Sequence, residues 1–208
     1  MLKGELDHIL WAVPDLERGM AEIEKLTGVK PKIGGRHPGV GTHNALLALG
    51  DKVFLEVIAP DPSQDRFSSF GLLVKGIEQP RLLSWVARTT DARRLSELAQ
   101  KNGLLPGVIL ALSRRRPDGT SVSWRTVTIG GHPYGPLIPY FIEWRSEEHP
   151  AEMSPGGCRL LRFEIETPDP RGVLATLEKL GLHLPVIEGP KGRLKASLET
   201  PKGRISLS

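Results

Sequence analysis

The chain has 208 residues, enough for one large domain or two small ones with a buried core. Hydrophobic residues make up 39% and charged residues 25%, as in ordinary globular proteins, and no apolar run approaches the roughly 18 residues of a membrane-spanning helix. The net charge of +4 is spread along the chain, without the long basic face or interleaved aromatic residues expected for nucleic-acid binding. These properties disfavour a membrane protein and a nucleic-acid partner, and they leave anionic small molecules as the simplest use of the charge.

Two further features bear on location and chemistry. Residues 1–7 contain no apolar segment of a secretory signal, so a cytoplasmic location is the default expectation. Cys158 is the only cysteine, which excludes an internal disulfide and a thiolate zinc cluster. Because no Gly-x-Ser-x-Gly elbow, HExxH pair or dinucleotide fingerprint occurs, a serine hydrolase, a zincin and a nucleotide cofactor have no support.

The first predicted unit occupies residues 5–60. Its apolar segment at 6–13 is typical of a strand, and the apolar spacing from Leu16 to Leu26 is typical of a helix. Asp15 can cap the free backbone N–H groups at the start of that helix, and Gly28 suits a left-handed cap at its end. Strand-like runs follow at residues 44–49 and 53–58.

The same order of segments recurs twice, in residues 81–145 and 157–208. The aspartates before the helices, Asp15, Asp91 and Asp169, lie 76 and 78 residues apart. The glycines after the helices, Gly28, Gly103 and Gly181, lie 75 and 78 residues apart. Because two independent markers report the same period, we expect three copies of one βαβββ unit. The later strands are expected at residues 82–88, 108–112, 122–127, 138–144, 160–166, 194–199 and 204–207.

With these units, the chain resembles the glyoxalase-like branch of the vicinal oxygen chelate superfamily. The third copy matches only the general unit, so the likeness extends over about residues 5 to 150. The resemblance implies an α+β fold in which two βαβββ modules form curved mixed sheets around a cleft, with a third βαβββ-like unit beside them. The likeness is carried by Leu6-Asp7-His8-Ile9, Val13-Pro14-Asp15-Leu16, the Gly34–Thr42 run with Asn44, Phe54-Leu55-Glu56-Val57, and Pro139–Trp144 with His149-Pro150.

This fold divides the chain into a domain of two modules at residues 1–150 and a third module at residues 157–208. A third unit without a mate leaves an open sheet edge or an apolar face, which it would bury against the first two units or in a homodimer. The basic run Arg114-Arg115-Arg116, beside Pro117-Asp118-Gly119, is interpreted first as a solvated hairpin tip.

In the superfamily, the cleft holds a divalent metal whose ligands come from the first and last strand of each unit. By position, the resemblance implies His8, Glu56 and Glu143 as metal ligands, since residues 53–57 match residues 140–144. Ser84 stands at the fourth position, and serine is a poor metal ligand. One imidazole and two carboxylates would suit Zn, Mn, Fe or Ni, with open positions for water or substrate.

Two functions follow from the resemblance. In the first, the metal binds two neighbouring oxygens of a small anionic substrate as a Lewis acid, and the non-ligating carboxylate, Glu56 or Glu143, moves the proton. Isomerase, lyase and dioxygenase-type reactions all fit that description. In the second, which Ser84 favours, the chain is a metal-free protein of bleomycin-resistance type that binds or sequesters a small molecule.

Candidate substrate contacts come from the glycine-rich stretch at residues 34–41 and from later strands. Glycines let the backbone approach a ligand closely, and an arginine can hold a carboxylate. A purely structural role remains open for every candidate. The glycine-rich stretch could be a flexible turn, the arginine could lie on the surface, and His8 could be a structural strand residue. The two glutamates could lie on solvated strand faces. The candidates are His37, Thr42, Asn44, Arg125 and Trp144.

Overall fold

The structure is a computed structural model, which describes residues 5–115 and 119–208. Its first unit has the predicted order of a strand, a helix and three strands. Asp15 accepts a hydrogen bond from the backbone N–H of Arg18 at 2.9 Å, and Gly28 ends the helix with a φ of 81°. Both predicted caps are therefore confirmed. The elements are β1 (Glu5–Ala12), α1 (Leu16–Thr27), β2 (Lys32–His37), β3 (Thr42–Gly50) and β4 (Val53–Pro60).

The second unit repeats this plan with an insertion before its last strand. Asp91 again caps its helix, here by accepting from the backbone N–H groups of Arg93 and Arg94. The predicted turn at Pro117 and Asp118 lies outside the described residues. A short helix, α2 (Ser69–Lys75), connects the first unit to the second. The second unit comprises β5 (Arg81–Arg88), α3 (Ala92–Lys101), β6 (Leu105–Pro106), β7 (Leu110–Arg115), β8 (Ser121–Val127), β9 (Ile129–Gly130), the 3₁₀ turn η1 (Gly135–Leu137) and β10 (Tyr140–Trp144).

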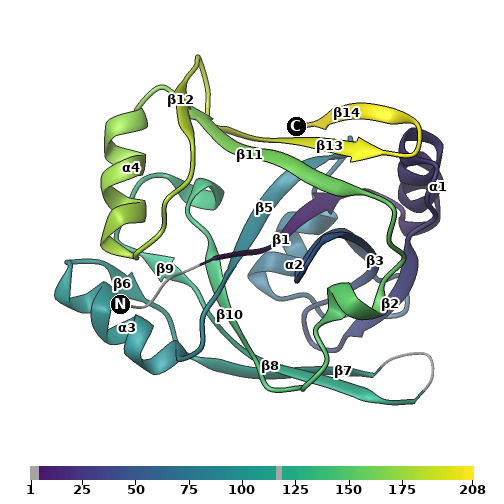
Figure 1. Cartoon of the computed structure of the whole chain (residues 1–208). Coiled ribbons are helices and arrows are strands. Elements are labelled where there is room, and N and C mark those ends of the chain that lie inside the picture. Colours follow the sequence, from purple (N-terminus) through teal and green to yellow (C-terminus); the bar gives the residue numbers. More distant parts are fainter. Residues whose placement is uncertain (1–4, 116–118) are drawn as a thin grey trace.

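These two units form one curved, nearly closed sheet of eight strands (Figure 1). The first and last long strands of each unit pair in parallel, β1 with β4 and β5 with β10. The two halves join through the antiparallel pair β1 and β5. Strong twist and curvature bring the edge strands β2 and β7 together, where Arg114 of β7 donates to Asn44 of β3 at 2.9 Å. The strand order is β2-β3-β4-β1-β5-β10-β8-β7.

The third unit has the predicted sequence of elements, but its strand order differs from that of the first two units. Its first strand lies parallel to its second strand and antiparallel to its third, giving the order β12-β11-β13-β14. The chain leaves β11, passes through α4 and returns beside β11, which is an ordinary βαβ crossover. The elements are η2 (Pro150–Met153), β11 (Arg159–Thr167), α4 (Pro170–Lys179), β12 (Val186–Glu188), β13 (Arg193–Thr200) and β14 (Gly203–Leu207).

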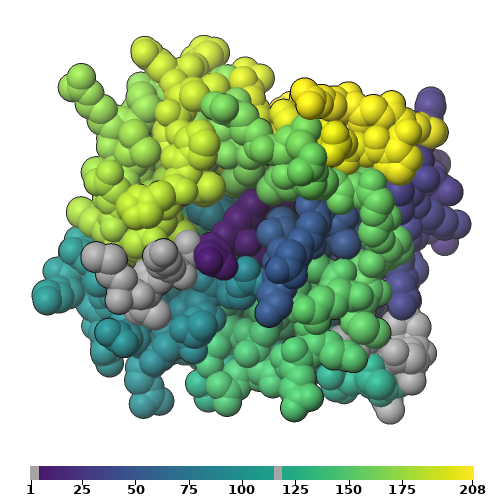
Figure 2. Space-filling view, viewed as in Figure 1, coloured from purple at the N-terminus to yellow at the C-terminus, as the bar shows by residue number. Residues whose placement is uncertain are grey.

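This third unit covers the convex face of the eight-stranded sheet. In Figure 1, β11 and β13 cross over β5 and β1, between α4 on one side and α1 on the other. Phe163 packs on Trp85 with ring centroids 5.6 Å apart, and one continuous apolar core joins the three units. Figure 2 shows the third unit packed directly on the first two. Its apolar face is thus buried within the chain; the proposed domain boundary stays a prediction.

No helix in the described ranges has the length and apolar character needed to cross a membrane.

Candidate functional site

A cavity of about 480 Å³ lies on the concave side of the eight-stranded sheet. Strands of both units form its walls, and the start of α2 lies at one end. Five of the chain's 11 phenylalanine, tyrosine and tryptophan residues line it, although the whole chain is only 5% aromatic. Apolar and aromatic walls with a few converging polar groups are typical of small-molecule sites. The five aromatic residues are Phe54, Phe70, Trp124, Tyr140 and Trp144.

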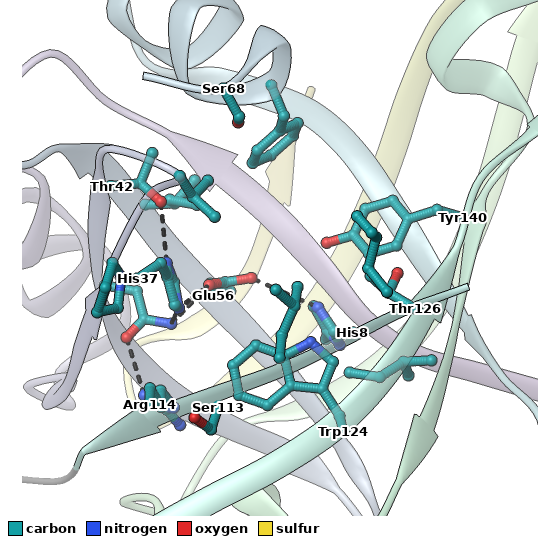
Figure 3. Close-up of a pocket in the computed structure, with 18 of the residues that line it drawn as sticks. His8, His37, Thr42, Glu56, Ser68, Ser113, Arg114, Trp124, Thr126 and Tyr140 are labelled. Carbon is teal, nitrogen blue, oxygen red and sulfur yellow. Dashed lines mark hydrogen bonds and ion pairs between the residues drawn. The ribbon is translucent and has the colours of Figure 1, made fainter. Parts of the chain in front are cut away.

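Glu56 lies at the centre of the polar groups in this wall (Figure 3). Its Oε1 accepts a hydrogen bond from Asn44 Nδ2 at 2.5 Å and lies 3.9 Å from His37 Nε2. Its Oε2 lies 3.4 Å from His8 Nε2. Burial alone would raise the pKa of Glu56, but the hydrogen bond and charge of His8, with His37 and Asn44, lower that pKa to about 2. Glu56 is therefore a carboxylate at neutral pH.

Asp7 holds His8 in place from behind the cavity wall. A β-bulge in β1 skips Asp7 in the pairing with β5, and the Asp7 side chain turns towards that of His8. Asp7 Oδ1 lies 2.7 Å from His8 Nδ1, while Oδ2 accepts from Trp144 Nε1 at 3.0 Å and lies 3.1 Å from His149 Nε2. Burial alone would lower the pKa of His8, but hydrogen bonds and charges from Asp7 and Glu56 raise it to about 9. His8 is thus an imidazolium at neutral pH.

His37 and Arg114 complete the polar cluster. Burial lowers the pKa of His37 to about 4, so its ring is neutral, and its Nδ1 lies 2.9 Å from Thr42 Oγ1. Arg114 is buried and lines the cavity. Its side chain fits only because position 34 is glycine: a Cβ there would lie 2.2 Å from Arg114 Nη1. The interpretation of Arg114 as part of a solvated tip is therefore wrong, because the closing of the sheet turns it inward.

The cavity brings together most of the predicted site residues, which reach it from five different strands. The sequence placed these residues in one cleft, and the structure has them there; their roles as ligands or substrate contacts stay predictions. The residues are His8, His37, Thr42, Asn44, Glu56 and Trp144.

Glu143 lies outside the cavity. Along β10, Tyr140, Ile142 and Trp144 line the cavity, so strand alternation turns Glu143 to the opposite face. There its Oε2 accepts from the backbone N–H of Ala92 at the start of α3 (3.2 Å), and Oε1 accepts from Arg145 (2.8 Å). The prediction that Glu143 shares a cleft with Glu56 is wrong, and so is the placement of Arg125 in that cleft.

Arg125 is half exposed and lies 3.9 Å from Glu143, on the same outer face of the sheet. Its neighbour on β8, Trp124, points into the cavity instead. The surface alternative that remained open for this arginine is therefore the one that the structure supports.

The pairing register explains the error over Glu143. Leu10 of β1 pairs with Glu56, and Val86 of β5 pairs with Tyr140. Leu10 and Val86 each lie five residues before the capping aspartate of their unit. Tyr140 therefore matches Glu56, just as Ser84 matches His8. The insertion containing β9 and η1 hides this correspondence in the sequence.

The residues present do not fit the predicted divalent metal site. Of the four matched positions, two carry the hydroxyl side chains of Ser84 and Tyr140. Both ring nitrogens of His8 already face carboxylates, Asp7 and Glu56. Among residues 5–115 and 119–208, no group of three or more histidine, cysteine, aspartate and glutamate side chains is arranged to hold a metal ion.

Sequence reasoning missed three residues of this site. Asp7 could have been noticed as a carboxylate next to the candidate His8 inside an apolar strand. Its side chain reaches that histidine only because of the β-bulge in β1, which the sequence does not reveal. Arg114 could not be found, because its burial depends on the meeting of the two sheet edges. Tyr140 could not be found either, because the insertion before β10 hides its register against β5 in the sequence.

Comparison with known proteins agrees with this architecture. A family model described as a glyoxalase-like domain matches residues 6–181. A hypothetical protein from Staphylococcus aureus has a similar structure, with a TM-score of 0.74, 15% sequence identity, and coverage of 93% of this chain and 88% of that chain. At this identity the likeness concerns the fold alone. No curated protein matches the sequence.

Methylmalonyl-CoA epimerases also occur among the similar structures. The enzyme from Mycobacterium tuberculosis has a TM-score of 0.46 and 19% identity, and the match covers 71% of this chain and 91% of that one. A Streptomyces coelicolor enzyme in complex with 2-nitronate-propionyl-CoA has a TM-score of 0.48 and 14% identity, with coverage of 70% and 100%. The family match spans most of the sequence, and the paired βαβββ units give the fold that it requires. This chain belongs to the glyoxalase-like domain family.

Proposed function

We propose that this protein binds a small, mainly apolar molecule carrying an oxygen-containing group, and that Glu56 moves a proton on it. The observation that carries the proposal is a charged carboxylate buried in the wall of an otherwise largely apolar cavity. Burying a charge costs free energy, and here two neighbours, His8 and Asn44, are needed to offset it. Such an arrangement at a cavity wall is characteristic of a functional group.

The proposed chemistry is of the isomerase type. Glu56 would take a proton from a carbon next to a carbonyl group. The protonated carboxyl group would exchange its proton with solvent and return one to the same carbon, to a neighbouring carbon or to the oxygen. Because the pKa of Glu56 is low, it is a weak base, so hydrogen-bond donors must stabilise the negative charge that develops on the substrate oxygen. The His8 imidazolium beside Glu56 contributes positive charge, although both of its ring nitrogens face carboxylates. No step passes through a metal, since the ligand positions do not fit one.

Proton exchange tests this proposal without knowledge of the natural substrate. In D₂O, the wild-type protein is expected to accelerate hydrogen–deuterium exchange at the carbon next to the carbonyl of 1-tetralone or phenylpyruvate, as followed by NMR. Glu56→Gln should lower the catalysed rate about 10²-fold or more. Glu143→Gln, the matched control on the outer face, should stay within about twofold of wild type. Equal exchange in wild type and Glu56→Gln would refute the role of Glu56.

A second function, sequestration without chemistry, is favoured by one observation. The charge of Glu56 is already matched by His8 and by the Asn44 hydrogen bond, so the cluster is complete before any substrate arrives. In that case Glu56→Gln should keep its affinity for both probes, and neither protein should accelerate exchange. Native mass spectrometry of freshly purified protein would then detect a retained organic molecule.

A further inference from the structure

Tyr140 presents a hydroxyl group to the cavity from the wall opposite Glu56. Figure 3 shows this hydroxyl pointing into the cavity, in the direction of Glu56. The Tyr140 ring is fixed by its strand and by edge-on packing against Phe70, with ring centroids 6.3 Å apart. Its position is thus set by the scaffold, and it needs no ligand to point inward.

Three other hydroxyl groups of the cavity, those of Thr126, Thr42 and Ser68, have partners within the protein. Thr126 donates to the backbone oxygen of Phe141 at 3.0 Å, Thr42 contacts His37, and Ser68 caps α2 by accepting from Gly71. By contrast, none of the residues described in the structure forms a hydrogen bond with the Tyr140 hydroxyl. A phenol in an apolar cavity normally has a partner, because burial without one costs free energy.

The surroundings of Tyr140 define what that partner can be. Burial, together with the negative charges of Glu56 and Asp7, raises the pKa of Tyr140 well above its ordinary value. The phenol therefore stays protonated and acts as a donor. The same two negative charges disfavour a carboxylate directly at this hydroxyl and favour an uncharged carbonyl oxygen.

We propose that Tyr140 donates a hydrogen bond to a carbonyl oxygen of the bound molecule, so that the cavity selects cyclic or aromatic ketones and aldehydes over the corresponding hydrocarbons. The inference rests on the proposed function only in taking the cavity as the binding site. The aromatic walls favour a molecule that contains a ring. Trp124 and Trp144 lie at 5.7 Å, tilted by 57°, and a flat ring can pack between them and the opposite wall.

The test compares two probes that differ by one oxygen, 1-tetralone and tetralin, with dissociation constants measured by ligand-observed NMR. Tyr140→Phe should weaken binding of 1-tetralone about five- to tenfold, the value of one hydrogen bond, and should leave tetralin unchanged. Tyr134→Phe is the matched control: it changes the only other tyrosine, which lies outside the cavity wall and bonds to Asp169. It should affect neither probe.

An infrared measurement reads the hydrogen bond directly. The carbonyl stretch of bound 1-tetralone should lie at a lower frequency in wild type than in Tyr140→Phe. The inference is overturned by equal affinities for 1-tetralone in the two proteins, by an equal loss for both probes, or by the absence of binding of either probe to wild type. The two proposals fail separately: if wild type does not accelerate proton exchange but Tyr140→Phe still weakens 1-tetralone binding and leaves tetralin unchanged, the role of Tyr140 stands.

Discussion

The polar residues of the cavity form one connected chain of contacts across the molecule. Arg114 donates to Asn44, Asn44 donates to Glu56, Glu56 faces His8, and His8 faces Asp7. Each member is buried, so each contact is worth more than it would be at the surface. This chain fixes the orientation of Glu56 before any ligand binds, which is what a proton-transferring group requires.

Gly34 leaves room for the contact between Arg114 and Asn44, where the two edges of the sheet meet. In Gly34→Ala, the new Cβ would lie 2.2 Å from Arg114 Nη1 and 2.4 Å from Asn44 Oδ1, so the contact between these two side chains must open. We expect a loss of about 1–3 kcal/mol in the free energy of unfolding, measured by urea denaturation. Gly156→Ala, where nothing lies within 4 Å of the added atom, should be within about 0.5 kcal/mol of wild type. Equal stability of the two variants would contradict this account.

His37 should make the protein sensitive to mild acid. Its folded pKa, lowered by burial to about 4, is below the unfolded value of 6.5, so the unfolded state takes up the proton first. The free energy of unfolding should therefore fall as the pH drops from 6.5 towards 4, by about 2 kcal/mol at pH 5 from this residue. His37→Gln should lack that part of the decline. Urea denaturation at pH 7.5 and pH 5 measures it, and parallel declines in both proteins would exclude His37 as the cause.

Among the elements, the sequence predicted the units far better than the pairing between them. The capping aspartates and terminal glycines act locally, so Asp15 and Gly28 were readable from the chain alone. The resemblance to the family also placed His8 and Glu56 in one cleft, and both line the cavity. Tyr140, and not Glu143, lines the cavity because of the hydrogen-bond register between β5 and β10, and the strand order of the third unit depends on the crossover through α4. No local sequence pattern encodes either feature.

The register of β5 with β10 leads to a prediction about metals. Since Ser84 and Tyr140 stand at the positions that match His8 and Glu56, we expect no equimolar binding of Zn²⁺ or Mn²⁺ in calorimetric titrations near neutral pH. Treatment with EDTA should change neither the affinity for 1-tetralone nor any catalysed exchange. Detection of an equimolar metal that is lost in Glu56→Gln would show that the side chains rearrange to bind it.

At the level of the whole molecule, the third unit completes the core. It buries Phe163 against Trp85 on the convex face, and the cavity lies on the concave face of the same strands. Because its apolar face is already covered, the homodimer that was one of two alternatives for an unmatched unit loses its main physical reason. The third unit therefore contributes to the site indirectly, by supporting β1 and β5 from behind.

Phe163→Ala tests that support. Phe163 is 5% exposed and packs in the shared core, so its truncation should cost about 3–5 kcal/mol in the free energy of unfolding. Leu161→Ala, two residues away on the same strand and 37% exposed, should cost less than about 1 kcal/mol. Both are measured by thermal or urea unfolding in a single cooperative transition. A separate early transition in Phe163→Ala would mean that the third unit folds independently of the other two.

The unlike residues at the matched positions of the two units have a stereochemical consequence. A carboxylate that can take up a proton approaches the bound molecule from β4, whereas a phenol that keeps its proton approaches from β10. A hydrogen removed by Glu56 can then return only to the face it left. Under the proposed function, this geometry favours suprafacial migration of a hydrogen or a double bond with retained configuration, because Tyr140, on the wall opposite Glu56, keeps its proton and does not act as the base that inversion of a stereocentre would demand.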